Sequence, residues 1–186
     1  WDFVELPSQI LENWCYERET LALFATHYKT GEIIPMEYVE KIKESATFHE
    51  GMQTLRQLSF GMLDMAWHGN DPSKITDVKA FEKGAFALTK LYPDVPENCM
   101  STSFAHIFQG GYSAGYYSYK WAEVLDADAF DYFKQEGIFN NTVADKFKEF
   151  VLSKGGTQDP MDLYVKFRGR KPDPDALLRR AGLIPA

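Results

Sequence analysis

Cysteine, basic charge and long apolar runs are all scarce in this chain. Its 186 residues include two cysteines, Cys15 and Cys99, which lie far apart and form no Cys-x-x-Cys motif. A disulfide framework and a cysteine zinc site are therefore disfavoured. No apolar run approaches the roughly 20 residues that a membrane-spanning helix needs, so we expect no membrane partner. The formal net charge of −7 argues against a nucleic-acid partner, because phosphates are bound by basic surfaces.

An initiator methionine is also missing, because the sequence begins with Trp1. We therefore expect the chain to be a piece of a longer protein, with its natural start upstream. The two unpaired cysteines and the acidic balance suit the cytoplasm, which is the expected location. An export signal in a preceding segment stays open as an alternative.

Helical periodicity dominates what is present. The chain is 45% hydrophobic and 15% aromatic, enough for a sizeable core. Apolar residues recur at steps of three and four from Met52 to Met65, which predicts an amphipathic helix of several turns. The best strand candidate, residues 31–35, is short. We predict an all-α fold of roughly seven or eight helices that forms a single helical domain over residues 1–186.

Capping residues, prolines and glycines predict where the other helices begin and end. Asp-Pro pairs predict an N-cap followed by proline in the first turn, and later glycines predict helix ends. Another helix is expected to have Asn141 or Thr142 as its N-cap and to stop at Gly155-Gly156. The remaining expected helices are residues 2–28, 35–45, 78–91, 113–137, 160–168 and 174–181.

The segment Phe104–Val124 gathers tyrosines after a histidine and two glycines. On a helix, Tyr112, Tyr116 and Tyr119 share one face because they are spaced i, i+4 and i+7. One interpretation is that they are core aromatics whose hydroxyls find partners. The other is that the hydroxyls line a cleft, where protonated phenols can donate to an oxygen that becomes negative in a transition state.

The residues before the tyrosines fit the second interpretation. His106 is a further candidate donor to such an oxygen. Gly110 and Gly111 allow a sharp turn or the close approach of a substrate chain. This chemistry also needs a group that activates the electrophile, and none of these residues supplies one.

Three segments of the sequence resemble one family. The stretches DFVELPSQILENW, HIFQGGYSAGYYSY and KFRGRKPDPDALLRRAGL are similar, in this order, to zinc metallopeptidases of the thimet oligopeptidase family, which includes oligopeptidases and peptidyl-dipeptidases. The resemblance covers essentially the whole chain. It implies a C-terminal portion of a helical, zincin-like catalytic domain that hydrolyses short peptides.

The resemblance also implies roles for individual residues. Glu5 corresponds to the third zinc ligand, although from spacing alone Asp2 and Glu5 look like a helix capping box. His106, Tyr112 and Tyr119 correspond to the groups that contact the substrate backbone and stabilise the oxyanion. Tyr116 corresponds to a substrate-binding tyrosine on the same face. Gly110 and Gly111 are also expected to contact the substrate.

One part of the family pattern is missing from the sequence. The family binds zinc with a His-Glu-x-x-His helix upstream of the DFVE segment, and its Glu is the general base. Here His49-Glu50 begins such a motif, but Gln53 stands in place of the second histidine. A catalytic zinc needs three protein ligands. We therefore expect zinc in the intact parent and none in this chain, which should be inactive alone.

Two other functions remain open at this point. The chain could be a metal-free module that binds peptides through His106 and the tyrosines. It could also be a purely structural helical module in which the tyrosines are core. Short peptides are the expected substrates of the enzyme. A homodimer is also expected to be possible, through apolar surfaces that the truncation exposes.

Overall fold

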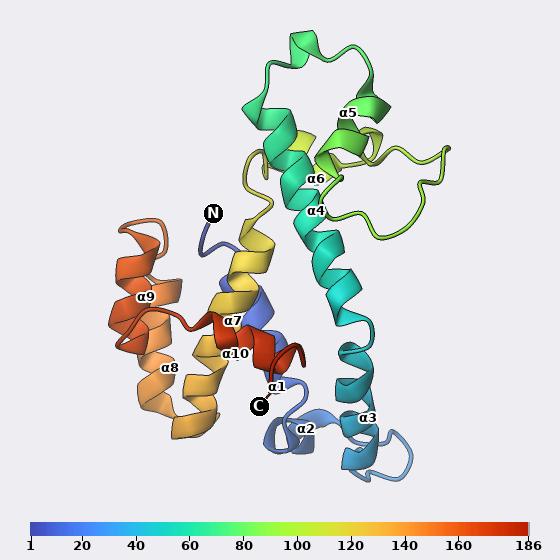
Figure 1. Cartoon of the computed structure of the whole chain (residues 1–186). Coiled ribbons are helices and arrows are strands. Elements are labelled where there is room, and N and C mark those ends of the chain that lie inside the picture. The colour runs from blue at the N-terminus through green and yellow to red at the C-terminus, as the bar shows by residue number, and fades with distance from the viewer. Residues whose placement is uncertain (186) are drawn as a thin grey trace. The chain divides into compact units, whose positions relative to one another are not determined.

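A computed structural model describes residues 1–185 and contains helices joined by loops (Figure 1). Within these residues there are ten α-helices, two short 3-10 helices and one π-helix, and the only β-type pairing is an isolated bridge between Thr26 and Ile33. The predicted all-α class is confirmed. The bounds of the α-helices are α1 Leu6–Trp14, α2 Arg18–Phe24, α3 Met36–Ala46, α4 Glu50–Gly69, α5 Val78–Ala85, α6 Ala105–Phe108, α7 Ser118–Glu136, α8 Asn141–Phe147, α9 Pro160–Arg168 and α10 Pro174–Arg180.

Contacts divide the chain into two compact units. Unit 1 combines Trp1–Glu50 with Trp121–Ala186, and unit 2 is the continuous segment Gly51–Lys120. Whether the chain acts as the expected single domain stays a prediction. No helix among residues 1–185 is both long and apolar enough to cross a membrane.

Unit 1 has an apolar core to which α1, α7, α8 and α9 contribute. Trp14 of α1 packs edge-on against Phe130 and Phe133 of α7, with ring centroids 4.8 and 4.9 Å apart. The Trp14 indole also donates a hydrogen bond to the Ile138 carbonyl at 3.0 Å. Helices α8 and α9 lie beside each other and close this core (Figure 1). Its buried members are Leu6, Ile10, Leu125, Ala129, Phe130, Phe133, Val143, Phe147, Val151, Tyr164 and Phe167.

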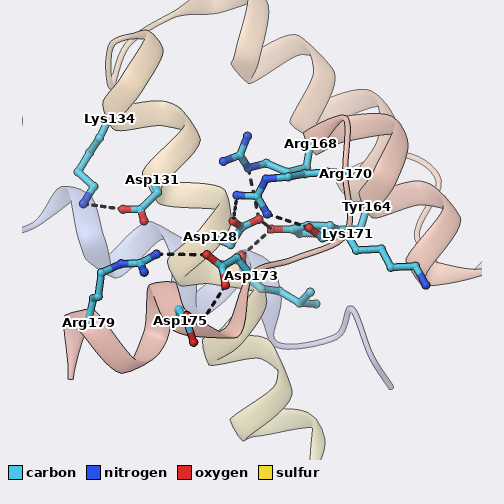
Figure 2. A network of polar contacts seen from close by, with 11 residues as sticks. Asp128, Asp131, Lys134, Tyr164, Arg168, Arg170, Lys171, Asp173, Asp175 and Arg179 are labelled. Carbon is cyan, nitrogen blue, oxygen red and sulfur yellow. Dashed lines mark hydrogen bonds and ion pairs between the residues drawn. The ribbon is translucent and has the colours of Figure 1, made fainter. Parts of the chain in front are cut away.

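A buried carboxylate joins two segments of unit 1. Asp128 of α7 is 1% exposed and accepts a hydrogen bond from the Tyr164 hydroxyl at 2.7 Å. Arg170 donates to the other oxygen, Oδ1, at 2.5 Å, and Arg168 Nε lies 3.3 Å from Oδ2, the oxygen that Tyr164 also contacts (Figure 2). Burial, followed by the charge of Asp128, raises the pKa of the Tyr164 phenol far above its ordinary range. The phenol therefore stays protonated and donating.

Unit 2 is built around the middle and C-terminal turns of α4. Phe60 and Leu63 are buried against Phe104 and Ile107, with Trp67, Ala85, Phe86, Met100 and Tyr116 packed around them. The carboxylate of Glu82 in α5 accepts hydrogen bonds from the backbone amides of Met100 and Ser101 at 2.9 and 2.6 Å. This contact fixes the end of the long loop that leads into α6.

Several predicted boundaries agree with the structure. Asp159 and Asp173 are the N-caps of α9 and α10, with prolines in the first turns, and Gly169 ends α9 in the left-handed conformation. The helix near residue 141 begins one residue early, because Asn140 is its N-cap. It continues through a π-helical turn, Lys148–Leu152, and stops before Gly155.

Three predicted elements are wrong in extent. Residues 2–28 form α1 and α2 instead of one helix, because Glu17 adopts an extended conformation between them. The helix expected over residues 78–91 ends at Ala85. The helix expected from residue 113 begins only at Ser118, for a reason that lies in the candidate site.

Candidate functional site

The loop between α6 and α7 carries most of the predicted site residues, all within unit 2. The chain reverses after α6, where the amides of Gly110 and Tyr112 donate to the carbonyls of Ala105 and His106 at 2.8 and 3.0 Å. The Ser113 hydroxyl then donates to the Ile107 carbonyl at 2.6 Å. These bonds fold the loop back over α6.

The loop gathers four rings into one cluster. The His106 ring centroid lies 6.1, 5.9 and 6.2 Å from those of Tyr112, Tyr116 and Tyr119. Tyr112 stacks on Tyr119 at 5.1 Å, and Tyr116 lies 5.0 Å from Tyr119. His106 is exposed, whereas the three tyrosines are half-buried. The residues that the sequence grouped are therefore neighbours, and the histidine lies at the solvent side.

The rings do not meet by sharing a helix face, as the spacing predicted. Tyr112 lies in irregular backbone and Tyr116 in a turn, and of the three tyrosines only Tyr119 is helical, in the first turn of α7. Ala114 has a φ of 53°, a left-handed conformation that interrupts any helix between the tyrosines. Turn geometry and nonlocal hydrogen bonds bring the rings together.

Tyr116 faces inward more than its neighbours. Its ring packs edge-on against Phe60 and Phe104, and its hydroxyl donates to the Gln57 side-chain oxygen at 3.4 Å. Burial, aided by Tyr119, raises the pKa of the Tyr116 phenol, and Arg56 opposes the shift. The hydroxyl is thus a protonated donor at neutral pH.

Glycine is required at positions 110 and 111 for two different structural reasons. Gly111 has a φ of 82°, which an L side chain rarely adopts. At Gly110 the constraint is space, because an added Cβ would lie 2.9 Å from the His106 Cα and 3.0 Å from its carbonyl oxygen. Gly110 therefore allows the loop to pass directly against the backbone of the histidine.

Substitution of Gly110 tests this close approach. Gly110→Ala should destabilise unit 2 by about 1–3 kcal/mol, because the clash is with backbone that cannot rotate away. Gly61→Ala is the matched control, since a Cβ at this α4 position meets nothing within 4 Å. It should stabilise the chain by up to about 1 kcal/mol through helix propensity. Urea unfolding of both variants checks this, and equal effects would contradict it.

Asp64 was missed by the sequence analysis and contacts this loop. It is 1% exposed, and its Oδ1 and Oδ2 accept hydrogen bonds from the amides of Ala114 and Tyr116, each at 2.9 Å. His68 Nδ1 lies 2.7 Å from Oδ1. A signal was present, because Asp64 falls on the apolar face of α4 with Phe60, Leu63 and Trp67.

Glu5 belongs to unit 1 and is the N-cap residue of α1. The capping box with Asp2 as N-cap is therefore wrong, since the helix begins at Leu6. The Ser8 hydroxyl donates to Glu5 at both its backbone carbonyl, 3.0 Å away, and its carboxylate Oε2, 3.1 Å away. Glu5 as a whole residue is half-buried at the start of this helix.

The chain's own metal-ligand side chains are dispersed in residues 1–185. No three or more His, Cys, Asp or Glu side chains in this range are grouped to hold a metal ion. The donor set that the chain itself offers around Glu5 therefore does not make a catalytic zinc centre, which uses three protein ligands.

Comparison with known proteins gives the class. The model of peptidase family M3 matches residues 1–183, and the chain belongs to this family. It is 45% identical over 185 residues to oligopeptidase A of Haemophilus influenzae, covering 99% of this chain and 27% of the relative. It is 36% identical over 184 residues to dipeptidyl carboxypeptidase of Escherichia coli, covering 98% of this chain and 27% of the relative.

A plant relative is similar over the same region. The chain is 45% identical over 194 residues to organellar oligopeptidase A, chloroplastic/mitochondrial, of Arabidopsis thaliana, covering 100% of this chain and 24% of the relative. The chain thus spans about a quarter of the length of the curated relatives it matches. The resemblance to the thimet oligopeptidase family is therefore confirmed by the match to peptidase family M3.

Proposed function

We propose that this chain is the C-terminal catalytic portion of a longer zinc-dependent metallopeptidase that hydrolyses short peptides. The observation that carries the proposal is the ring cluster of His106 in α6, Tyr112 and Tyr116 in the following loop, and Tyr119 in α7. Membership of peptidase family M3 supports the reaction class. The names of two relatives, oligopeptidase A and dipeptidyl carboxypeptidase, support short peptides as substrates.

The proposed roles follow from the chemistry of each side chain. Glu5 would be one zinc ligand, with the remaining ligands and the general base outside the given sequence. Zinc, when bound, supplies Lewis-acid polarisation of a water molecule. Tyr119 and His106 donate hydrogen bonds to the oxygen that becomes negative as the peptide carbonyl is attacked. Tyr112, stacked on Tyr119, holds the substrate backbone.

In this proposal, Tyr116, Gly110 and Gly111 complete the substrate-binding surface. The ring of Tyr116 packs on Phe60 and Phe104, and its hydroxyl donates to Gln57, so Tyr116 fixes the position of Tyr119. The exposed part of Tyr116 contacts the substrate. Gly110 and Gly111 keep the wall free of side chains next to His106. A cytoplasmic location remains part of the proposal, supported by the acidic balance and by cysteines unpaired within residues 1–185.

The test compares two lengths of the protein. We expect the full-length product of the source gene to bind one zinc and to cleave short quenched fluorescent peptides. The 186-residue chain should do neither, because it contributes one ligand where three are needed. Zinc is measured by mass spectrometry and cleavage by fluorescence. Stoichiometric zinc binding and peptide cleavage by the 186 residues alone would contradict the proposal that the remaining zinc ligands and the general base lie outside the given sequence.

A further inference from the structure

Asp64 differs from the other buried acids in what it binds. Asp126 and Asp128 face arginines, whereas the two oxygens of Asp64 accept hydrogen bonds from the backbone amides of Ala114 and Tyr116. Its third partner is His68, whose Nδ1 lies 2.7 Å from Oδ1. A carboxylate that is almost fully buried is thus used to hold a loop.

The loop held in this way is the one that separates the tyrosines. Ala114 has a positive φ of 53°, a conformation that costs a non-glycine residue about 1–2 kcal/mol. The hydrogen bond from its amide to Asp64 offsets this cost. Tyr112 lies two residues before Ala114, and Tyr116 follows two residues after it. The backbone path between the rings therefore depends on Asp64.

We propose that Asp64 is a positioning residue for peptide hydrolysis, whose carboxylate fixes the backbone at Ala114 and Tyr116 and so sets the placement of Tyr112 and Tyr119. This inference rests on the proposed function. Asp64 acts through the loop and donates nothing to the substrate. Its anchor is rigid, because α4 is a helix of 20 residues and Phe60 and Leu63 are buried beside it.

The carboxylate is specifically required by this geometry. An ionised carboxylate is an acceptor at both oxygens, whereas an asparagine amide has one acceptor oxygen and one donor nitrogen. Asp64→Asn keeps the size of the side chain but sets an N–H group against one of the two backbone amides. One loop amide loses its partner, and the loop moves relative to α4. A displacement of about 1 Å can cost about 100-fold in rate.

The experiment uses the full-length protein and a matched control. Asp126→Asn changes another buried carboxylate, which accepts hydrogen bonds from Arg180 and Asn13 and lies in unit 1. We measure kcat, KM, zinc content, Tm and hydrogen exchange of the peptide covering residues 110–119. In Asp64→Asn, kcat should fall about 10- to 100-fold with unchanged zinc content, and exchange in residues 110–119 should rise. Asp126→Asn should lose Tm but retain kcat and loop protection.

The outcomes separate this inference from the function on which it rests. If Tyr119→Phe lowers kcat while Asp64→Asn behaves as Asp126→Asn does, Asp64 is a structural residue only and the inference is wrong. If Tyr119→Phe leaves kcat unchanged, the proposed role of the ring cluster fails, and the positioning role fails with it. Should Asp64→Asn not fold, Asp64→Glu serves the same test, because it keeps the charge but displaces both oxygens. Wild-type kcat in that variant would overturn the inference.

Discussion

Replacing Tyr119 with Phe in the full-length protein is expected to lower kcat about 10²- to 10³-fold, the usual effect of losing one donor to an oxyanion. The change removes one hydroxyl and keeps the ring, so stacking on Tyr112 at 5.1 Å and packing on Tyr116 at 5.0 Å are preserved. The loss should therefore appear in kcat and not in zinc content. Steady-state cleavage of a fluorescent peptide, with zinc analysis, measures it.

The matched control is Tyr117→Phe, two residues earlier and just before α7. The Tyr117 side chain is 46% exposed, and this residue has no proposed role in the reaction. Its replacement should leave kcat within about twofold, as expected for a surface change away from the reacting groups. Equal losses for the two variants, or an unchanged kcat in Tyr119→Phe, would remove Tyr119 from the oxyanion role.

Asp128→Ala is expected to have the largest effect on stability. The side chain is 1% exposed and pairs with Arg168, Arg170 and the Tyr164 hydroxyl (Figure 2). Removal leaves Arg168, only 10% exposed, without this carboxylate and deprives the Tyr164 hydroxyl of an acceptor. Breaking a buried pair in this way costs about 3–5 kcal/mol. Urea unfolding of the 186-residue chain, followed by tryptophan fluorescence, measures the loss.

Asp131→Ala is the control for that measurement, three residues further along α7. Asp131 pairs with Lys134 at 2.7 Å, and both side chains are solvent-accessible, at 32% and 50%. Its removal should cost less than about 1 kcal/mol, because water screens such pairs. A cost for Asp128→Ala as small as that for Asp131→Ala would show that the buried network contributes little.

The fold was predictable where its signals are local. The boundaries of α9 follow from Asp159-Pro160 and Gly169, because capping and the left-handed glycine are determined by neighbouring residues. The break between α1 and α2 gave no such signal, since neither proline nor glycine lies at residues 15–17. It accompanies the contacts of Trp14 with Phe130, Phe133 and the Ile138 carbonyl, which are distant in sequence.

That the rings of His106 and the tyrosines lie close together was predictable from the sequence, and the geometry that brings them together was not. The resemblance and the spacing both singled out His106 and the tyrosines, and their rings are neighbours. The expected common helix face was wrong, because Asp64 binds two amides of the loop and Ala114 takes a positive φ. A carboxylate 50 residues away determines this path, and no local pattern at the tyrosines records it.

The division of the chain has a consequence for synthesis on the ribosome. Unit 2 is continuous, from Gly51 to Lys120, whereas unit 1 joins Trp1–Glu50 to a segment that begins at Trp121. Leu6 and Ile10 of α1 are buried against residues of α7 that are translated more than 100 positions later. Unit 2 can therefore form its own contacts as it leaves the ribosome. The apolar face of α1 stays exposed until α7 has been synthesised. Nascent chains that end before α7 should be those that need a chaperone.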